Sequence, residues 1–174
     1  MPTTYEPIAT TTVSGSSTSA ITFSGISQAY TDLRLIVSSR ETGSGTAYSS
    51  LFVRFNNLST SIYSTTRLTG TGTSVVSNRS SSQTEMSVLA GNAGSTSTSG
   101  TFNLSIMDIL SYTDSTNKTM LASVSADNNG SGFTVRQIFL ARTTSAITRI
   151  DLTDETGSNF ASGTTATLYG ILKA

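Results

Sequence analysis

The chain has 174 residues, its ten Lys and Arg balance ten Asp and Glu, and its formal net charge is zero. Serine and threonine fill 64 of the 174 positions, while histidine, cysteine and tryptophan are absent. The sequence therefore lacks the commonest general base, thiolate ligands and disulfides, and its balanced charge does not attract phosphate or anionic lipid. We expect no cofactor, no nucleic-acid partner and no membrane partner.

Apolar and polar residues alternate along most of the chain, which is the period of a half-buried strand. Leu33, Leu35 and Val37 share one face in the first long run, and Leu51, Val53 and Phe55 do so in the next. The predicted strands, in chain order, are Ala20–Phe23, Leu33–Arg40, Leu51–Phe55, Ile62–Leu68, Met86–Leu89, Phe102–Ile109, Met120–Ala126, Val135–Ala141, Ile147–Leu152 and Ala166–Leu172. About ten strands predict an all-β fold, an antiparallel β-sandwich of jelly-roll type, with another Greek-key topology as the alternative.

The first 19 residues precede the first predicted strand. We expect residues 1–19 to form a flexible N-terminal arm or an edge segment, and residues 20–174 to form a single β-sandwich domain. Tyr5, Pro7 and Ile8 make an apolar tag within the first segment. This tag predicts either docking on a partner subunit or closure of one sheet edge, and both readings stay open. These residues are the candidate partner interface.

Two long spacers rich in small polar residues separate predicted strands, Thr69–Thr84 and Ala90–Gly100. We expect them to be exposed loops, where binding residues usually lie. The only stretch in which a helical turn is expected to fit is Val75–Leu89. The segment Asp127–Gly130 contains an Asn-Gly pair between two predicted strands, which predicts a hairpin turn.

A serine-lysine pair is the one arrangement that could supply a nucleophile and a base in the absence of histidine. Ser115 and Lys118 have the spacing of such a pair, but they follow Asp114 in a turn-like segment. We therefore interpret the pair as part of a hairpin turn. We predict no catalytic residue and no enzymatic activity.

The densest acidic cluster is formed by Asp151, Asp154 and Glu155 at the end of a predicted strand. Carboxylates grouped in this way can bind calcium. The favoured interpretation is a solvated loop whose aspartates cap turns, so no metal site is predicted.

Most arginines and aromatic residues have a structural role in this prediction. Four arginines next to inward apolar positions are expected to point outward, to carboxylates or to a neighbouring subunit: Arg34, Arg54, Arg136 and Arg149. Six phenylalanines are expected in the core: Phe23, Phe52, Phe55, Phe102, Phe133 and Phe139.

Several segments, taken in order along nearly the whole chain, resemble a group of small bacteriophage virion structural proteins. They are Tyr5–Thr12, Tyr30–Arg40, Arg54–Asn57 leading to Tyr63–Leu68, and Ser162–Ile171. The resemblance implies a β-sandwich component of the virion, commonly oligomeric and without enzymatic activity. It also implies assembly in the bacterial host cytoplasm.

Two roles within a virion fit the sequence. A capsid decoration or cement protein would contact copies of itself, for example as a homotrimer, and the major capsid or other virion proteins. A head- or tail-fibre appendage would contact the host surface instead. The small single domain and the hydroxyl-rich neutral surface favour the first role. A lectin-like carbohydrate-binding module is a third hypothesis, which would require calcium or an aromatic platform.

Overall fold

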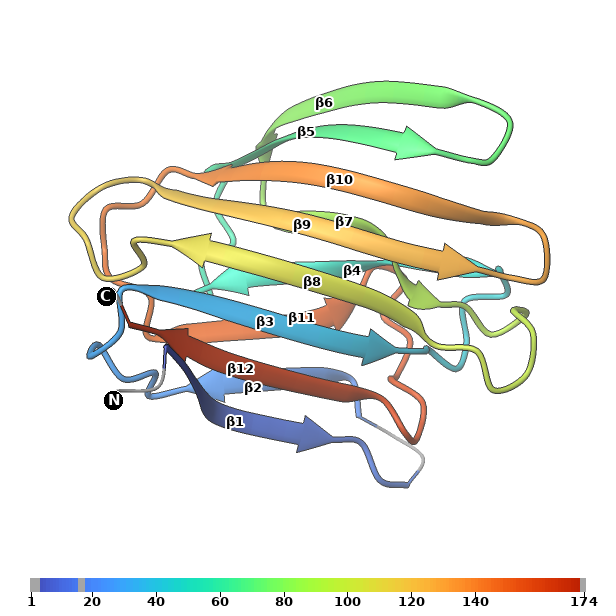
Figure 1. Ribbon diagram of the computed structural model, residues 1–174, viewed down its shortest axis with the longest axis horizontal. Helices are drawn as coiled ribbons and strands as arrows, with labels where there is room; N and C mark the ends of the chain where they lie inside the picture. The colour runs from blue at the N-terminus through green and yellow to red at the C-terminus, as the bar shows by residue number, and fades with distance from the viewer. Residues whose placement is uncertain (1–3, 16–17, 173–174) are drawn as a thin grey trace.

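The computed structural model describes residues 4–15 and 18–172, which form an all-β fold of antiparallel strands in two sheets (Figure 1). None of these residues belongs to a helix that could cross a membrane. The strands are β1 (Tyr5–Thr12), β2 (Ala20–Ser24), β3 (Asp32–Ser39), β4 (Tyr48–Phe55), β5 (Tyr63–Gly70), β6 (Val75–Gln83), β7 (Met86–Ala93), β8 (Asn103–Leu110), β9 (Lys118–Asp127), β10 (Gly132–Ala141), β11 (Arg149–Asp154) and β12 (Thr165–Ile171). The predicted sandwich-like, all-β architecture is confirmed.

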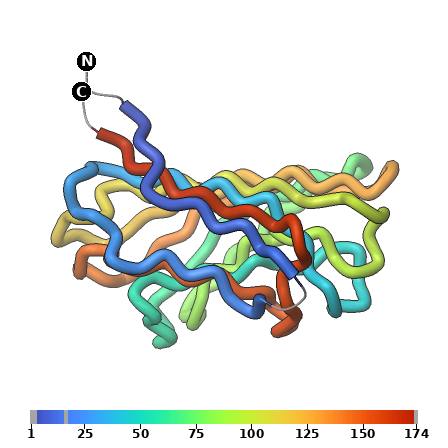
Figure 2. Tube along the Cα trace, turned by 90° about the horizontal axis from the view of Figure 1, so that it is seen from below, coloured from blue at the N-terminus to red at the C-terminus, as the bar shows by residue number. Residues whose placement is uncertain are grey.

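The two sheets differ in size. The large sheet has eight strands in the order β1-β12-β3-β8-β9-β10-β5-β6, and the small sheet has four in the order β2-β11-β4-β7. In the second view the strands run along two layers, with β1 and β12 side by side (Figure 2). The large sheet therefore extends beyond the small sheet on the side of β6.

Four ladders join strands that are nested in the sequence. They pair β1 with β12, β2 with β11, β3 with β8, and β4 with β7. Two hairpins interrupt this nesting: β5–β6 lies between β4 and β7, and β9–β10 lies between β8 and β11. Both hairpins join the large sheet beyond β8, so they account for its extension.

The core lies between the two sheets and follows the predicted alternation. Leu33, Leu35 and Val37 of β3 are fully buried, and so are Val53 and Phe55 of β4. The inward-facing residues predicted for these two strands are confirmed. Because buried apolar area is the main source of folding free energy, these strands form the centre of the stable unit.

Side chains from the large sheet satisfy the backbone of β7, which is an edge strand of the small sheet. Gln137 of β10 is buried; its Oε1 accepts a hydrogen bond from the Leu89 amide (2.8 Å) and its Nε2 donates to the Ser87 carbonyl (3.0 Å). Asn103 of β8 donates to the carbonyl of Ala90 at 2.9 Å. These amides take the place of a further strand, since buried peptide groups need partners.

All ten predicted strands are present, with shifted ends, but β1 and β6 were not predicted. The segment expected as a flexible arm or an edge segment contains β1, an edge strand of the large sheet that pairs along β12 with a bulge between Pro7 and Ala9. Its pattern is obscured because a proline and a bulge interrupt the alternation. The rest of the arm prediction falls partly on residues 1–3 and 16–17, which lie outside the described residues.

Of the two spacers expected as exposed loops, the first is largely strand and the second is strand only at its start. Most of Thr69–Thr84 is β6, which pairs with β5, and no helical turn occurs there. The residues of β6 are exposed on both faces, so its sequence carries no alternation. The start of Ala90–Gly100 continues β7 as far as Ala93. The predicted Asn-Gly turn is confirmed, since Asn129 and Gly130 both have positive φ between β9 and β10.

The six phenylalanines divide into two groups. Phe23, Phe55 and Phe139 are buried as predicted. The core prediction is wrong for the half-buried Phe52, which lies between two inward residues of β4 and so points outward. It is also wrong for Phe102, which is half-buried at the loop end of β8, whereas the half-buried Phe133 packs against the core from the loop end of β10.

Candidate functional site

Ser115 and Lys118, interpreted from the sequence as part of a hairpin turn, lie at the turn between β8 and β9. Ser115 is exposed, whereas Lys118 is buried and donates through Nζ to the carbonyls of Thr116 (2.6 Å) and Asp114. Burial lowers the pKa of Lys118. The ammonium group therefore holds the turn through backbone carbonyls, which agrees with the turn interpretation.

The predicted acidic cluster separates onto the two faces of the small sheet. Asp151 lies on the outer face, where it accepts hydrogen bonds from Arg149 (2.7 Å) and Thr22 (2.8 Å). Burial opposes ionisation of Asp151, but the hydrogen bonds from Arg149 and Thr22 outweigh it and lower its pKa.

Asp154, by contrast, faces the interior. It accepts a hydrogen bond from Asn92 at 2.8 Å and one from the Thr156 amide at 2.9 Å, so it caps a turn as expected but is not solvated. Glu155 accepts from the Ser50 amide at 2.7 Å. In the described part of the chain, no group of three or more acidic residues is placed to hold a metal ion.

The candidate interface residues do not form one patch. Tyr5 is 47% exposed, and the guanidinium carbon of Arg34 lies 5.4 Å from its ring centre. Pro7 is also exposed, opposite Tyr169 of β12. Ile8 is half-buried and packs against the core. Partner contact through these residues stays a prediction, and Ile8 has a packing role within the chain.

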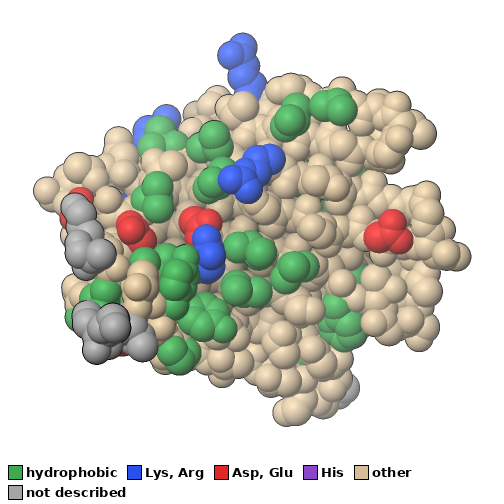
Figure 3. Space-filling model, viewed as in Figure 1, with side chains coloured by type: hydrophobic (Ala, Val, Ile, Leu, Met, Phe, Trp, Pro, Cys, Tyr) green, Lys and Arg blue, Asp and Glu red, His purple; other side chains and the backbone are tan. Residues whose placement is uncertain are grey.

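The outer face of the large sheet is the most extensive candidate surface. The ladders place Arg34, Asp108, Leu121 and Ile138 in one row across β3, β8, β9 and β10. Figure 3 shows this face with apolar side chains gathered among polar ones. The exposed or half-buried apolar residues on it are Ile36, Leu68, Leu104, Ile106, Leu110, Leu121, Ile138 and Leu140.

The exposure of these side chains is unusual for their size. Ile138 is 54% exposed, Leu68 is 52% exposed and Leu110 is 50% exposed. Single exposed apolar residues are common, but a set that spans several neighbouring strands is typical of an interaction surface.

An ion pair fixes the polar part of this face. Arg34 donates to Asp108 through Nε (2.6 Å) and Nη2 (2.9 Å), and this hydrogen bonding raises the pKa of Arg34. The outward, carboxylate-paired arginines predicted from the sequence are confirmed at Arg34, Arg54 and Arg149. The fourth, Arg136, is also exposed and donates instead to the hydroxyl of Ser123.

A groove of about 350 Å³ lies on this face beside β6. Its lining includes Ser64, Thr66 and Arg79, with Ile138 and Leu140 contributing apolar surface. The groove combines a cation, small hydroxyls and branched apolar groups. Such a lining suits a side chain or short segment of a partner protein.

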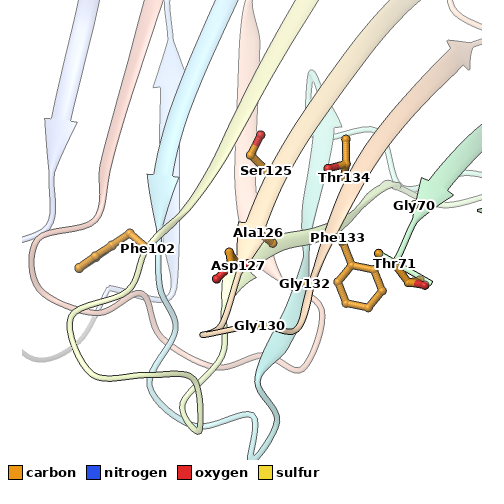
Figure 4. Close-up of a pocket in the computed structure, with 11 residues that line it drawn as sticks. Gly70, Thr71, Phe102, Ser125, Ala126, Asp127, Gly130, Gly132, Phe133 and Thr134 are labelled. Atoms are coloured by element: carbon orange, nitrogen blue, oxygen red, sulfur yellow. The ribbon is translucent and has the colours of Figure 1, made fainter. Parts of the chain in front are cut away.

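An open trough of about 530 Å³ lies where the β9–β10 and β5–β6 hairpins turn. In Figure 4, Asp127 and Ser125 lie between Phe102 and Phe133, Thr134 lies next to Phe133 on β10, and Thr71 lies beyond Phe133. Gly132 permits close packing here, because a Cβ at that position would lie 2.2 Å from the carbonyl oxygen of Ala126. The trough offers hydroxyls and one carboxylate for hydrogen bonding.

Comparisons with protein-family models, curated proteins and solved structures gave no match to this chain. The resemblance to phage virion proteins therefore stays a prediction. The outer face itself was not predicted. The sequence did carry a signal for it, because some strands have apolar residues at adjacent positions, which face opposite sides of the sheet. Examples are Ile36 beside Leu35 and Ile138 beside Phe139.

Proposed function

We propose that this chain is a non-enzymatic structural protein of a bacteriophage virion, and specifically a capsid decoration or cement protein. In this proposal it contacts copies of itself, for example as a homotrimer, and the major capsid or other virion proteins. Its place is in the particle, after assembly in the host cytoplasm. The observation that carries the proposal is the apolar outer face of the large sheet.

The composition of this face supports a role in assembly. Exposed leucines and isoleucines alternate with hydroxyl residues and one ion pair, which is the mixture found in subunit interfaces that remain partly wet. A net charge of zero adds little repulsion between copies. Many modest contacts of this kind become strong when several copies bind one particle.

We further propose that the sandwich is a jelly roll with two inserted hairpins. A jelly roll forms when a long hairpin of eight strands folds over, so that nested pairs become neighbours in two sheets. The nested ladders support this topology, because they give the orders β1-β12-β3-β8 and β2-β11-β4-β7. The hairpins β5–β6 and β9–β10 then extend only one sheet.

The test compares two lysine substitutions in a phage whose own copy of this gene is deleted and replaced. Ile138→Lys places a charge on the outer face of the large sheet, and Ser24→Lys places the same charge on the small sheet. We expect purified particles to contain at least about tenfold less of the first variant, since burying an unpaired charge is costly. They should contain normal amounts of the second. Absence of the wild-type chain from purified particles would contradict the proposal.

We propose glycan binding in the trough as a second candidate function. The specific observation is that Phe102 and Phe133 border hydroxyl groups and Asp127, although the spacers Thr69–Thr84 and Ala90–Gly100 contain no aromatic residue. A glycan array, read with and without a chelator, tests this candidate. Binding that Phe102→Ala abolishes would support it, and an array without signal would reject it.

A further inference from the structure

Charge is unevenly distributed over the large sheet. We call strands β10, β5 and β6 (Gly132–Ala141, Tyr63–Gly70 and Val75–Gln83) the wing. Its charged residues are Arg67, Arg79 and Arg136, with no acidic residue among them. The four strands at the other side of the sheet hold three carboxylates, those of Glu6, Asp32 and Asp108, and one arginine, Arg34. A chain with no net charge thus has one cationic sheet edge.

The positive charge of the wing is not neutralised within the described residues. Their three ion pairs, Arg34–Asp108, Arg54–Glu85 and Arg149–Asp151, involve no arginine of the wing. Glu85 lies two residues after β6, but it is held by Arg54 of β4. The wing therefore attracts a group of negative charge.

The edge formed by β6 is open to pairing. All nine residues of β6 are exposed, and within the described chain β5 is its only neighbour in the sheet. It contains no proline and a single charged residue, Arg79. The opposite edge, β1, is interrupted by Pro7 and a bulge, which are devices that protect an edge from pairing. The β6 edge has no proline, and its own register shift lies near its end, opposite Tyr63–Thr65, so that Val75–Ser80 pairs with β5 in regular register.

A small cavity of about 160 Å³ lies on the inner side of the wing. Arg67 Nε and Thr65 Oγ1, both from residues that line it, are buried without hydrogen-bond partners. Ser80 and Gln83 of β6 also line the cavity, as does the Glu85 carboxylate that Arg54 neutralises. An acceptor group entering this cavity would satisfy the two orphaned donors.

We propose that the β6 edge binds an extended acidic segment of another virion protein, which adds to the eight-stranded sheet as its ninth strand. The inference rests on the proposed function for the source of the partner. Backbone hydrogen bonds to β6 supply affinity, and alternate side chains of the segment face the two sides of the wing. A carboxylate on the outer side lies beside Arg79, as a cross-strand neighbour.

Charge also distinguishes this occupant from a second copy of the chain. Pairing of β6 with β6 about a two-fold axis would bring the Arg79 side chains of both copies onto one narrow strip, where like charges repel. Pairing of β6 with β1 would meet the interruption at Pro7. An acidic segment avoids both difficulties.

The experiment uses the purified full chain and a fluorescent nine-residue peptide of alternating Glu and Val, matched in length to β6. The same peptide with Lys in place of Glu is the charge control. We expect anisotropy to report binding of the Glu peptide alone, and Arg79→Glu to weaken it about tenfold or more through charge reversal. Ser24→Glu, which adds a negative charge on the small sheet, should change affinity less than about twofold. Equal binding of the Lys peptide, or no binding of the Glu peptide, would overturn the inference.

Two further peptides separate strand addition from simple ionic attraction. Each is N-methylated on alternate residues, one on the odd and one on the even positions, so that each loses the amide donors of one edge. A strand added to β6 tolerates only one of the two sets, because only one edge of it faces β6. Equal binding of both would reject strand addition. This assay does not use particles, so its failure is distinguishable from absence of the chain in virions.

Discussion

The nested sandwich and the β5–β6 hairpin are made of similar residues but are held in different ways. In β3 every second side chain is buried, whereas all nine residues of β6 are exposed. Strand β3 has a neighbour on each side and the small sheet beneath it, while β6 has only the ladder to β5 within the described chain. Burial of apolar side chains therefore holds the nested sandwich together, whereas backbone pairing with a single neighbour holds β6 in place.

The largest expected effect tests the buried side of this comparison. Leu35→Asp places a carboxylate at a fully buried position, so we expect a loss of more than about 4 kcal/mol in the free energy of unfolding. The expected result is a chain without cooperative thermal unfolding in circular dichroism. Ile36→Asp, one residue along the same strand, is the matched control because Ile36 faces outward. A native melting curve for Leu35→Asp would show the register to be wrong.

The next effect concerns the contact between the layers. Gln137→Leu removes the amide that pairs with Ser87 and Leu89 of β7, and leaves two backbone groups without partners. We expect a loss of about 2–3 kcal/mol in urea unfolding, because unsatisfied buried groups keep their desolvation penalty. The control is Arg136→Leu, at the preceding outward position. Equal stability of the two variants would mean that β7 does not depend on this side chain.

The sequence predicted the sandwich because its strands are buried on one face. Leu33, Leu35 and Val37 repeat at a period of two, and the structure buries all three. The same reasoning failed for β6, since a strand exposed on both faces has no period to detect. The strand order could not be predicted from the sequence either, because the two hairpins that extend the large sheet pair β10 with β5, which lie far apart in the sequence.

The candidate surface was harder to predict than the fold. Ile106 and Ile138 lie in predicted strands, at positions that an alternating pattern leaves for polar residues. Which apolar residues meet on one face depends on the register between strands, and the sequence does not contain that register. The prediction that the acidic residues share one solvated loop is wrong for a related reason. Asp151 and Asp154 lie on opposite faces of one strand.

A smaller effect depends on pH. Because burial lowers the pKa of Lys118 in the folded chain, the unfolded chain holds more protons as the pH approaches the ordinary lysine pKa. The contribution of Lys118 to stability should therefore increase as the pH rises toward the ordinary lysine pKa of about 10.4. Lys118→Met should lack this increase when the two chains are compared by urea unfolding at each pH. Parallel curves for both chains would contradict the proposed burial of the charge.

The smallest effect returns to the wing. Val76 of β6 is 45% exposed, and Val37 of β3 is fully buried, so the same Val→Thr change probes both regions with an almost unchanged shape. At Val37 the new hydroxyl is desolvated, which should cost about 1–2 kcal/mol. At Val76 it remains in water, and the change should stay within about 0.5 kcal/mol. Urea unfolding measures both. If Val76→Thr were as destabilising as Val37→Thr, the inner side of β6 would be covered by another part of the chain or by a second copy, and the edge would not be free for a partner.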